Sequence, residues 1–589
     1  EVPILVCDGL AEGADQLVAE VVAELRQLPA TRCLKLVAVT PMPLAFYRED
    51  FDTSESLSAL ETRLAEADAR VELALTKENQ ALLEANPKAE IDRTPQYERL
   101  GKYLANSVFL LLALWDGEDL DAPTPGGTAD VVRMKLDGCE NVQYTLGQTQ
   151  TFWAEKAPWE SIQPFGGVFQ IVTPRRNSAA QDSAGKTESW FSTDVQDATK
   201  IQEVYRHQHK PMTAEQFLME TSMERPIELL GEANRDAMKF YPQSEKAREK
   251  SRKYLLGDFR PAKSGNLEFI TRYYTIFDVL AQKYQSYFNK MAAIYICLGV
   301  LFALLFYVEC FVKSSLMEFS TFEFCLDSCK WNWDGEWTWW RVGVDATYFL
   351  VLAVLIAVYV LYKKRPYYER YHRYRALAEA LRVQIFWQTS GVTERVMDNY
   401  HYHPIGSLDW LRNTVNTIVI PLTPSSDFTE DHRDLKFVYE RWILDQRAFF
   451  FSRIGEMKKA SDRWSGWCMC FTYLAVGWLF VRIGTNRVSL DPAWLHWVYC
   501  LGAVALASCG ALAVACYLHN RFRCYDSQKN RYDKIFPIFH AYSLALEKRL
   551  AQNQEIDTQT RKELHKIGTY ALTENADWFL TQRKLELPK

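Results

Sequence analysis

Four long apolar blocks stand out in the second half of the chain. They cover residues 291–312, 346–362, 464–481 and 492–518, and they hold almost no charged side chains. A helix needs roughly 20 apolar residues to cross the hydrocarbon core of a bilayer. The blocks are close to this length, so the pattern predicts four membrane-spanning helices in two pairs. An amphipathic run over 266–290 leads directly into the first block and predicts a helix that continues into it.

The first 175 residues have a different pattern, in which short apolar runs alternate with helical periodicity. Residues 4–8, 34–43 and 107–119 are predicted as β-strands, and the third is a continuous apolar run, as parallel strands buried on both faces require. Glycine-rich loops follow the first strand, at 9–13, and the third, at 125–128. At such a loop, backbone N–H groups and a helix N-terminus stabilise an anion such as phosphate. Two glycine loops at strand ends predict one ligand crevice.

Four motifs of this region resemble one known family. GLAEGAD at 9–15, PMPLAFYREDF at 41–51, LALWDG at 112–117 and PGGTADVV at 125–132 occur in the order seen in the SLOG superfamily, the Rossmann-like fold shared by Smf/DprA and LOG proteins. The resemblance covers about residues 1–175 and implies a domain that binds nucleotides or nucleotide-derived ligands, as in the cytoplasmic sensors of some channels and prokaryotic defence effectors. Carried over by position, the ligand-binding residues are Gly9, Glu12, Gly13, Asp15, Trp115, Asp116, Gly126, Gly127 and Thr128. The family's earlier strand, which often carries a GHR-like motif, has no counterpart here, and whether such a strand precedes this sequence stays open.

The second glycine loop departs from the enzymes of that family. LOG enzymes use a PGGxGTxxE loop whose glutamate supports cleavage of nucleoside monophosphates, whereas this chain lacks the second glycine step and has Val131 at the position of the acid. Asp130 is close by but lies at a different helical angle. We therefore expect no catalytic residues. A membrane-tethered nucleotide or NAD hydrolase remains an alternative, with carboxylates available at Glu12, Asp15, Asp116 and Asp130.

Other chemistry is sparse in the sequence. No Gly-x-Ser-x-Gly, Walker or HExxH motif occurs, so no further enzyme class is indicated. The pairs His207/His209 and His401/His403 lack the additional Cys or His that a metal site requires, and we expect no metal and no cofactor apart from the ligand. With 68 Lys+Arg against 74 Asp+Glu, the net charge of −6 argues against a general nucleic-acid binder.

Charges beside the apolar blocks predict their orientation. Residues 363–375 hold six basic side chains and one acidic, whereas the 313–341 loop holds three basic and five acidic. Basic flanks stay on the cytoplasmic side, so we expect a multi-pass protein of the inner membrane with both termini in the cytoplasm. Cys325 and Cys329 share the outer loop, where an oxidising periplasm would permit a disulfide, although their four-residue spacing leaves the pairing open.

Two carboxylates fall near the outer ends of the predicted spans. Glu309 ends the first block and Asp345 precedes the second, which places both at one level of the membrane. In an oligomer they would form an acidic ring that favours cations. The alternative is that both are interfacial residues hydrated by lipid headgroups.

The expected fold class is an α/β Rossmann-like N-terminal domain plus an all-α four-span transmembrane region with a cytosolic helical layer. We expect a homo-oligomeric membrane effector or channel-like protein, of the kind used in prokaryotic stress or antiphage defence, that binds a nucleotide-like small molecule and the lipid bilayer. A transporter is a further alternative, although it would predict charged or Gly/Pro-broken spans. The expected parts are the sensor at 1–175, a linker at 176–262, a juxtamembrane helix with the first pair of spans at 263–375, a cytosolic helical region at 376–463, the second pair at 464–518 and C-terminal helices at 519–589.

Overall fold

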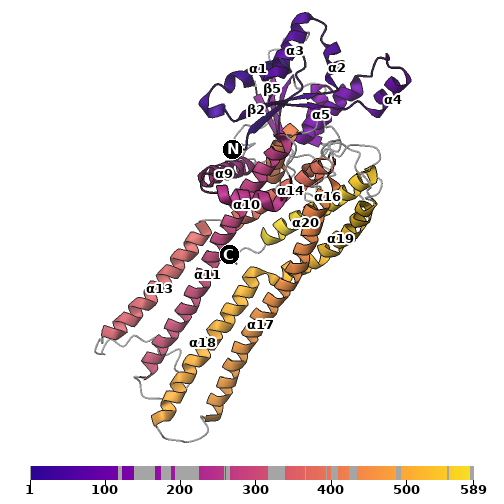
Figure 1. The fold of residues 1–589 in the computed structure, drawn as a ribbon. Coiled ribbons are helices and arrows are strands. Elements are labelled where there is room, and N and C mark those ends of the chain that lie inside the picture. The colour runs from indigo at the N-terminus through magenta and orange to yellow at the C-terminus, as the bar shows by residue number, and fades with distance from the viewer. Residues whose placement is uncertain are drawn as a thin grey trace. The chain divides into compact units, whose positions relative to one another are not determined.

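The computed structural model is mostly helical, with small sheets near the N-terminus (Figure 1). It falls into two compact units. Unit 1 consists of Glu1–Leu280, Arg373–Arg441 and Leu550–Lys589, and unit 2 of Ala281–His372 and Trp442–Arg549. The structure describes residues 2–116, 123–137, 166–173, 188–192, 224–257, 259, 265–315, 339–364, 367–392, 394–399, 409–422, 434–485, 493–552 and 556–583.

Unit 1 begins with a parallel three-stranded sheet in the order β1-β2-β3. Its strands are β1 (Ile4–Asp8), β2 (Leu34–Thr40) and β3 (Ala69–Glu72). The connecting helices α1 (Ala14–Leu25) and α3 (Ser54–Glu66) pack together on one face of this sheet, because their apolar stripes contact the same core as Leu36 and Ala38 of β2. The short helices α2 (Leu44–Tyr47) and α4 (Lys77–Ala85) lie in the connections.

Helix α5 (Thr94–Ser107) covers the other face of this sheet. Its Leu100 and Tyr103 share a core with Val37 and Val39 of β2. Side chains alternate between the two faces of a strand, so Val37 and Val39 lie opposite Leu36 and Ala38. The first sheet is therefore covered on both faces.

A second sheet has the order β4-β5-β6. β4 (Leu110–Trp115) pairs in parallel with β5 (Gly167–Val172), and β6 (Glu188–Ser192) pairs antiparallel with β5. Helix α6 (Thr128–Asp137) packs on β4 and beside α5. The prediction that this strand is buried on both faces is wrong, because Leu110 and Leu112 are 39% and 43% exposed. β1 and β4 each form an edge of their own sheet, so the parallel strands do not make one continuous sheet.

The rest of unit 1 is a helical layer. It contains α9 (Glu224–Phe240), α10 (Glu245–Leu256), most of α14 (Tyr367–Thr389), the 3-10 turn η5 (Val396–Asn399), α15 (Asp409–Val419) and α20 (Thr558–Arg583). Buried hydrogen bonds join these helices. The Tyr374 hydroxyl donates to Asp236 over 2.6 Å, and the Trp387 indole N–H donates to the carbonyl of Leu564 over 3.3 Å. Helices α9 and α10 lie in the segment 176–262, which was expected to be a linker.

Unit 2 is built around four long helices. They are the second part of α11 (Gly265–Ser315), α13 (Trp339–Lys364), α17 (Asp445–Thr485) and α18 (Ala493–Arg523), followed by α19 (Tyr525–Ala551). Figure 1 shows the four running along a common direction. As predicted, the amphipathic run and the first apolar block form one continuous helix, α11. A π-helical turn at Tyr439–Leu444 precedes α17.

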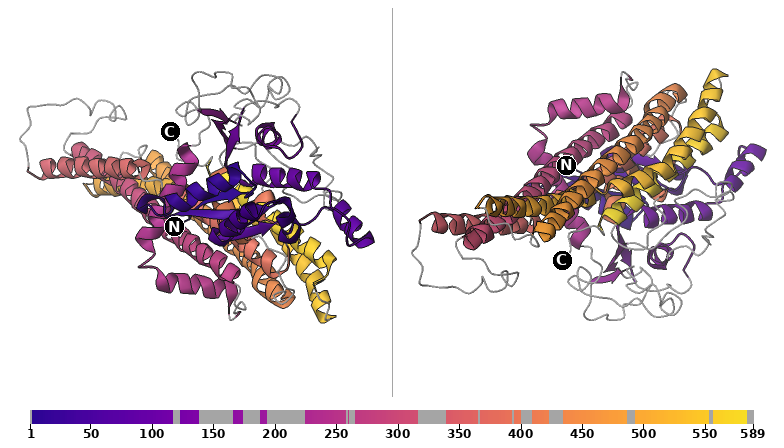
Figure 2. Two further views of the ribbon diagram at one scale, coloured as in Figure 1. Left: turned by 90° about the horizontal axis from the view of Figure 1, so that it is seen from above. Right: turned by 90° about the horizontal axis from the view of Figure 1, so that it is seen from below.

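Helices α17 and α18 form an antiparallel pair, which Figure 2 shows side by side. At the middle of α17, Ser465 accepts a hydrogen bond of 3.1 Å from Asn520 near the end of α18. Toward the other end, the Trp478 ring packs on Gly502 so closely that a β-carbon at Gly502 would lie 1.7 Å from it. Small residues in apolar helices allow this close approach.

Two helical stretches of the described residues are long and apolar enough to cross a membrane. They are Leu267–Ala303 and Leu435–Val481, and Phe349–Leu361 is a shorter apolar helix. Cys325, Cys329 and both histidine pairs lie outside the described residues.

Candidate functional site

The first glycine loop is organised around two carboxylates. Asp8, the last residue of β1, is buried and accepts a 2.7 Å hydrogen bond from the backbone N–H of Leu10. Asp15, in the first turn of α1, accepts a hydrogen bond from the N–H of Ala11. A β-carbon at Gly9 would lie 2.9 Å from a carboxylate oxygen of Asp15, so glycine is what allows Asp15 to lie against the loop. The loop and α1 therefore hold two acids together at the carboxyl end of β1.

These two acids cannot both ionise freely. The pKa of Asp8 is raised to about 8, chiefly by burial and also by the charge of Asp15, although the hydrogen bond from Leu10 opposes the rise. Burial also raises the pKa of Asp15, against the hydrogen bond from Ala11. The pair therefore retains a proton near neutral pH, and that proton belongs to the pair rather than to either residue.

The motif at 41–51 closes over this loop. The buried Tyr47 hydroxyl donates a 2.9 Å hydrogen bond to the carbonyl of Gly9. Tyr97 of α5 donates to Asp50 over 2.7 Å, and Arg93 forms an ion pair with the same carboxylate. Because these residues come from three separate segments, they fix the loop against α5.

Glu12 and Gly13 occupy the outer part of the first loop. Glu12 is exposed, and its carboxylate accepts a weak 3.4 Å hydrogen bond from the Ser56 hydroxyl. Gly13 has φ of +101°, a conformation that glycine adopts without strain, and a β-carbon there would meet no atom within 4 Å. Both predicted residues are accessible beside the acid pair.

The backbone N–H groups of the second glycine loop are hydrogen-bonded to residues of the same segment. The N–H of Gly126 donates to Asp130 over 2.9 Å, and that of Gly127 donates to the carbonyl of Thr124 over 2.9 Å. Asp130 is 2% exposed and also accepts a 2.8 Å bond from Arg133. The Asp130 carboxylate therefore occupies the hydrogen-bond donors before the N-terminus of α6, which begins at Thr128. A phosphate at this loop would have to displace that carboxylate.

Both loops lie against the same helix. A β-carbon at Gly9 would lie 3.2 Å from the Leu100 side chain, and one at Gly126 would lie about as close to the α5 backbone, 2.9 Å from the N–H nitrogen of Glu98. Gly126 also has φ of +76°. The first half of α5 is thus the surface that the two predicted loops share.

Trp115 and Asp116 follow at the end of β4. Trp115 is buried in the core with α6, and its carbonyl accepts hydrogen bonds from the Gln170 side chain and the Thr173 N–H, each of 3.2 Å. Trp115 thus closes the second sheet at this end. Asp116 comes directly after it and is partly exposed.

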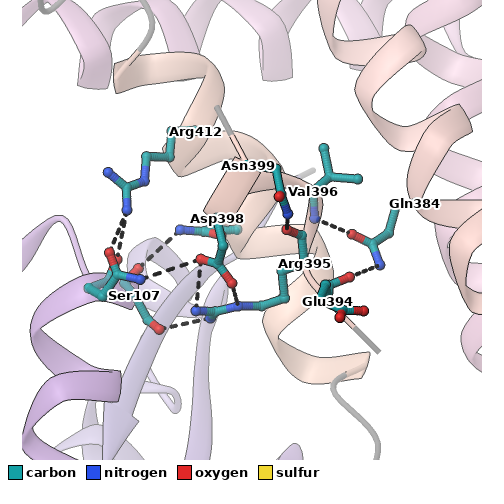
Figure 3. Close-up of polar contacts among 10 residues, drawn as sticks. Ser107, Gln384, Glu394, Arg395, Val396, Asp398, Asn399 and Arg412 are labelled. Carbon is teal, nitrogen blue, oxygen red and sulfur yellow. Dashed lines mark hydrogen bonds and ion pairs between the residues drawn. The ribbon is translucent and has the colours of Figure 1, made fainter. Parts of the chain in front are cut away.

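A second polar cluster lies where α5 ends, and most of its side chains are buried (Figure 3). Arg395 forms two hydrogen bonds with the carboxylate of Asp398, of 2.8 and 3.1 Å, and a third of 2.8 Å with the hydroxyl of Ser107. Arg412 of α15 donates to the side-chain oxygen of Asn106 over 2.6 Å. Burial alone would lower the pKa of Arg395, but Asp398 outweighs it, so Arg395 keeps its charge.

The sequence analysis missed Asp8 and this second cluster. Asp8 could have been predicted from the sequence, since it is a carboxylate between a predicted strand and a glycine loop. Nothing in the sequence indicates that Arg395 and Asp398 belong with Ser107, because Ser107 is almost 300 positions away in the chain.

No metal site accompanies these residues in the part of the chain that the structure describes, where no group of three or more His, Cys, Asp or Glu side chains could hold an ion. No protein family model, curated protein or solved structure matches this sequence.

The acid pair predicts an unusual response of stability to pH. The folded pKa of Asp8 lies above its value of about 3.8 in the unfolded chain, so the stability that its protonated form contributes is complete below about pH 4 and is lost as pH rises to about 8. Asp8→Asn keeps an acceptor for Leu10 without the charge. We expect its Tm at pH 8 to exceed the parent value by roughly 2–4 °C or more, and the difference to shrink toward pH 4. Equal Tm values for both proteins at every pH would contradict the assignment.

Proposed function

We propose that this protein is a membrane effector in which an N-terminal, Rossmann-like SLOG domain binds a nucleotide-derived ligand and four helices cross the bilayer. The observation that carries the proposal is the exposure of apolar side chains along unit 2. Tyr473 and Phe480 of α17 are 71% and 70% exposed, and Leu350 of α13 is 63% exposed. Burial of such a side chain is worth roughly 1.5–3 kcal/mol, so leaving many in water is costly.

A soluble alternative would require these helices to be covered. In the two stretches that are long and apolar enough to span, only 6% and 0% of the most apolar segment is buried. A core helix of a soluble protein would be mostly buried, whereas lipid tails cover an exposed apolar helix at no cost. The bilayer is therefore the covering that suits this chemistry.

The four-span arrangement follows from pairing and flanking charge. Helix α18 packs along α17 and, like α13, is apolar over most of its length. The basic residues after α13 and after α18 favour the cytoplasm on that side, which supports the proposal that both termini are cytoplasmic and the protein lies in the inner membrane.

The ligand chemistry differs between the two glycine loops. At the first loop, the acid pair offers acceptors for ribose hydroxyls, while the charge of Asp8 and Asp15 disfavours phosphate there. At the second loop, the N-terminus of α6 suits a phosphate once Asp130 is displaced. This division supports a nucleotide-derived ligand lying along α5.

Gly126→Val should abolish ligand binding. The substitution forces a branched side chain into a positive φ and within 3.0 Å of the α5 backbone, which moves the loop. We expect mass spectrometry of small molecules retained by the purified protein to find a nucleotide derivative in the parent and none in Gly126→Val, with equal membrane insertion. As a control, Gly231→Val alters a glycine of α9, outside the sheets. Equal retention by Gly126→Val and the parent would contradict the site.

A membrane-tethered hydrolase is the second candidate, and Asp8 is the observation in its favour. A carboxyl group with a pKa of about 8 is protonated at neutral pH and can donate a proton to a leaving group. Incubation with NAD or nucleoside monophosphates decides between the two. The effector proposal expects no free base, whereas turnover that disappears in Asp8→Asn would establish the enzyme.

The output of the effector is proposed to be a pore formed by a homo-oligomer, as in prokaryotic stress or antiphage defence. Glu309 lies on α11 and Asp345 on α13, the two helices of the first pair. A ring of both acids would favour cations. Neutralising both should reduce cation-over-anion selectivity in current recordings, and unaltered reversal potentials would support interfacial positions instead.

A further inference from the structure

Helix α5 connects the first glycine loop at residues 9–13, here called the β1 loop, to the second polar cluster around Arg395 and Asp398, here called the arginine cluster. Its first half contacts the loop, since Leu100 lies 3.2 Å from the position of a β-carbon on Gly9 and Tyr97 belongs to the cores on both faces of the first sheet. Its last two residues, Asn106 and Ser107, provide partners for the arginine cluster. The distance between these contacts is about two helical turns, or roughly 11 Å.

The arginine cluster belongs to the helical layer. Arg395 immediately precedes η5, Asp398 lies within it, and both are buried, at 4% and 2% exposed. Arg412 comes from α15, which also provides a 3.4 Å hydrogen bond from Asn416 to the carbonyl of Ser107. Figure 3 shows Arg395 with Ser107 on one side and Asp398 on the other. The end of α5 is thus held by η5 and α15 through polar contacts.

Arg395 also acts on β1 directly. Its guanidinium group lies 4.8 Å from the Tyr103 ring of α5. Burial raises the pKa of the Cys7 thiol to about 12, and the charge of Arg395 opposes this rise. Cys7 is the neighbour of Asp8 in β1, so the arginine acts on both the strand and the helix that bound the acid pair.

Buried ion pairs seldom add net stability, because desolvation of the charges offsets their attraction. Their hydrogen bonds nevertheless depend steeply on distance and angle, so a small displacement of one partner breaks them, whereas an apolar contact tolerates the same displacement. A movement of Ser107 or Asn106 therefore changes the hydrogen bonds of the arginine cluster.

We propose that Arg395 and Asp398 sense the occupancy of the β1 loop through α5 and pass it to the helical layer. The inference rests on the proposed function only in taking that loop as the ligand site. A ligand that moves Gly9 or Asp15 displaces Leu100, α5 carries the displacement to Ser107, and η5 responds.

Gly9→Ala provides a test that needs no ligand. Gly9 does not have a positive φ, so its backbone accepts alanine, and the added carbon would press on Leu100 and Asp15. In the intact protein in detergent, we expect hydrogen exchange of the Val396 and Asp398 amides to accelerate at least about fivefold. Both amides are hydrogen-bonded, to the Gln384 side chain at 2.8 Å and to the carbonyl of Arg395 at 3.1 Å.

Three comparisons make the test specific. In Gly231→Ala the added carbon meets only the Arg235 side chain of its own helix, α9, so the two amides should exchange as in the parent. In the double variant Arg395→Met/Asp398→Leu, adding Gly9→Ala should change their exchange less than twofold. The Gly257 amide, bonded at the end of α10, reports general loosening.

Unchanged exchange at Val396 and Asp398 in Gly9→Ala would overturn the proposal, and so would an equal acceleration at Gly257. Either result leaves the proposed function standing. Failure of the protein to retain a nucleotide, by contrast, would contradict the proposed function without affecting this mechanical coupling.

Discussion

Arg395→Met is expected to lower the free energy of unfolding by about 3–5 kcal/mol, because it leaves the buried carboxylate of Asp398 without its cation. Ser107 loses its partner at the same time. In a domain of this size the loss corresponds to a fall in Tm of roughly 10 °C. Thermal unfolding of the detergent-solubilised protein, followed by tryptophan fluorescence, measures it.

Removing both charges should restore most of this stability. Arg395→Met/Asp398→Leu replaces the pair by apolar side chains of similar size, which is often neutral or stabilising. The matched control is Arg373→Met/Glu232→Leu, an ion pair of 3.2 Å that joins α14 to α9. If the double variant is as unstable as Arg395→Met, Arg395 stabilises the fold by its packing and not by compensating the charge of Asp398.

Leu474→Arg is expected to prevent normal insertion of α17. Leu474 is 56% exposed, so in a water-soluble protein an arginine there would be harmless. At the centre of a membrane helix an arginine costs about 2.5–3.5 kcal/mol, or roughly a hundredfold in the insertion equilibrium. Extraction of cell membranes at alkaline pH should release or deplete the variant and retain the parent.

Phe451→Arg is the matched control for this change. Phe451 lies on the same helix and is 69% exposed, but it precedes the apolar segment at 464–481 by about three turns. This variant should remain in the membrane fraction. If Leu474→Arg is retained to the same extent as Phe451→Arg, the exposed face of α17 does not contact lipid.

The parts of the fold that depend on local periodicity could be predicted from the sequence. The strands β1, β2 and β4 coincide with short apolar runs, and the apolar blocks lie within α11, α13, α17 and α18. Helices extend beyond the blocks because helical periodicity continues in polar residues, as in the 51 residues of α11. Periodicity does not reveal strand pairing between distant segments, which is why the separation of β1 from β4 was not foreseen.

For the candidate site, only the glycine positions of the two loops could be predicted from the sequence. Gly9, Gly13 and Gly126 stood out because glycine permits close approach or a positive φ. The role of Asp130 was not foreseen, since its contact with the Gly126 N–H depends on the turn geometry. The raised pKa of Asp8 arises from burial and from Asp15, which a sequence does not display.

If unit 2 crosses a membrane while the sheet domain stays in the cytoplasm, a membrane-impermeant maleimide should reach only the outer side of unit 2 in intact cells. One variant retains Cys325, between α11 and α13 in the sequence, as its single cysteine. In the other, all native cysteines are replaced and the single cysteine is introduced by Leu82→Cys on α4, a position that is 41% exposed in the parent. The account predicts that Cys325 is labelled in intact spheroplasts and that the cysteine at position 82 is labelled only after lysis. Labelling of position 82 before lysis, or of Cys325 only after it, would contradict the account.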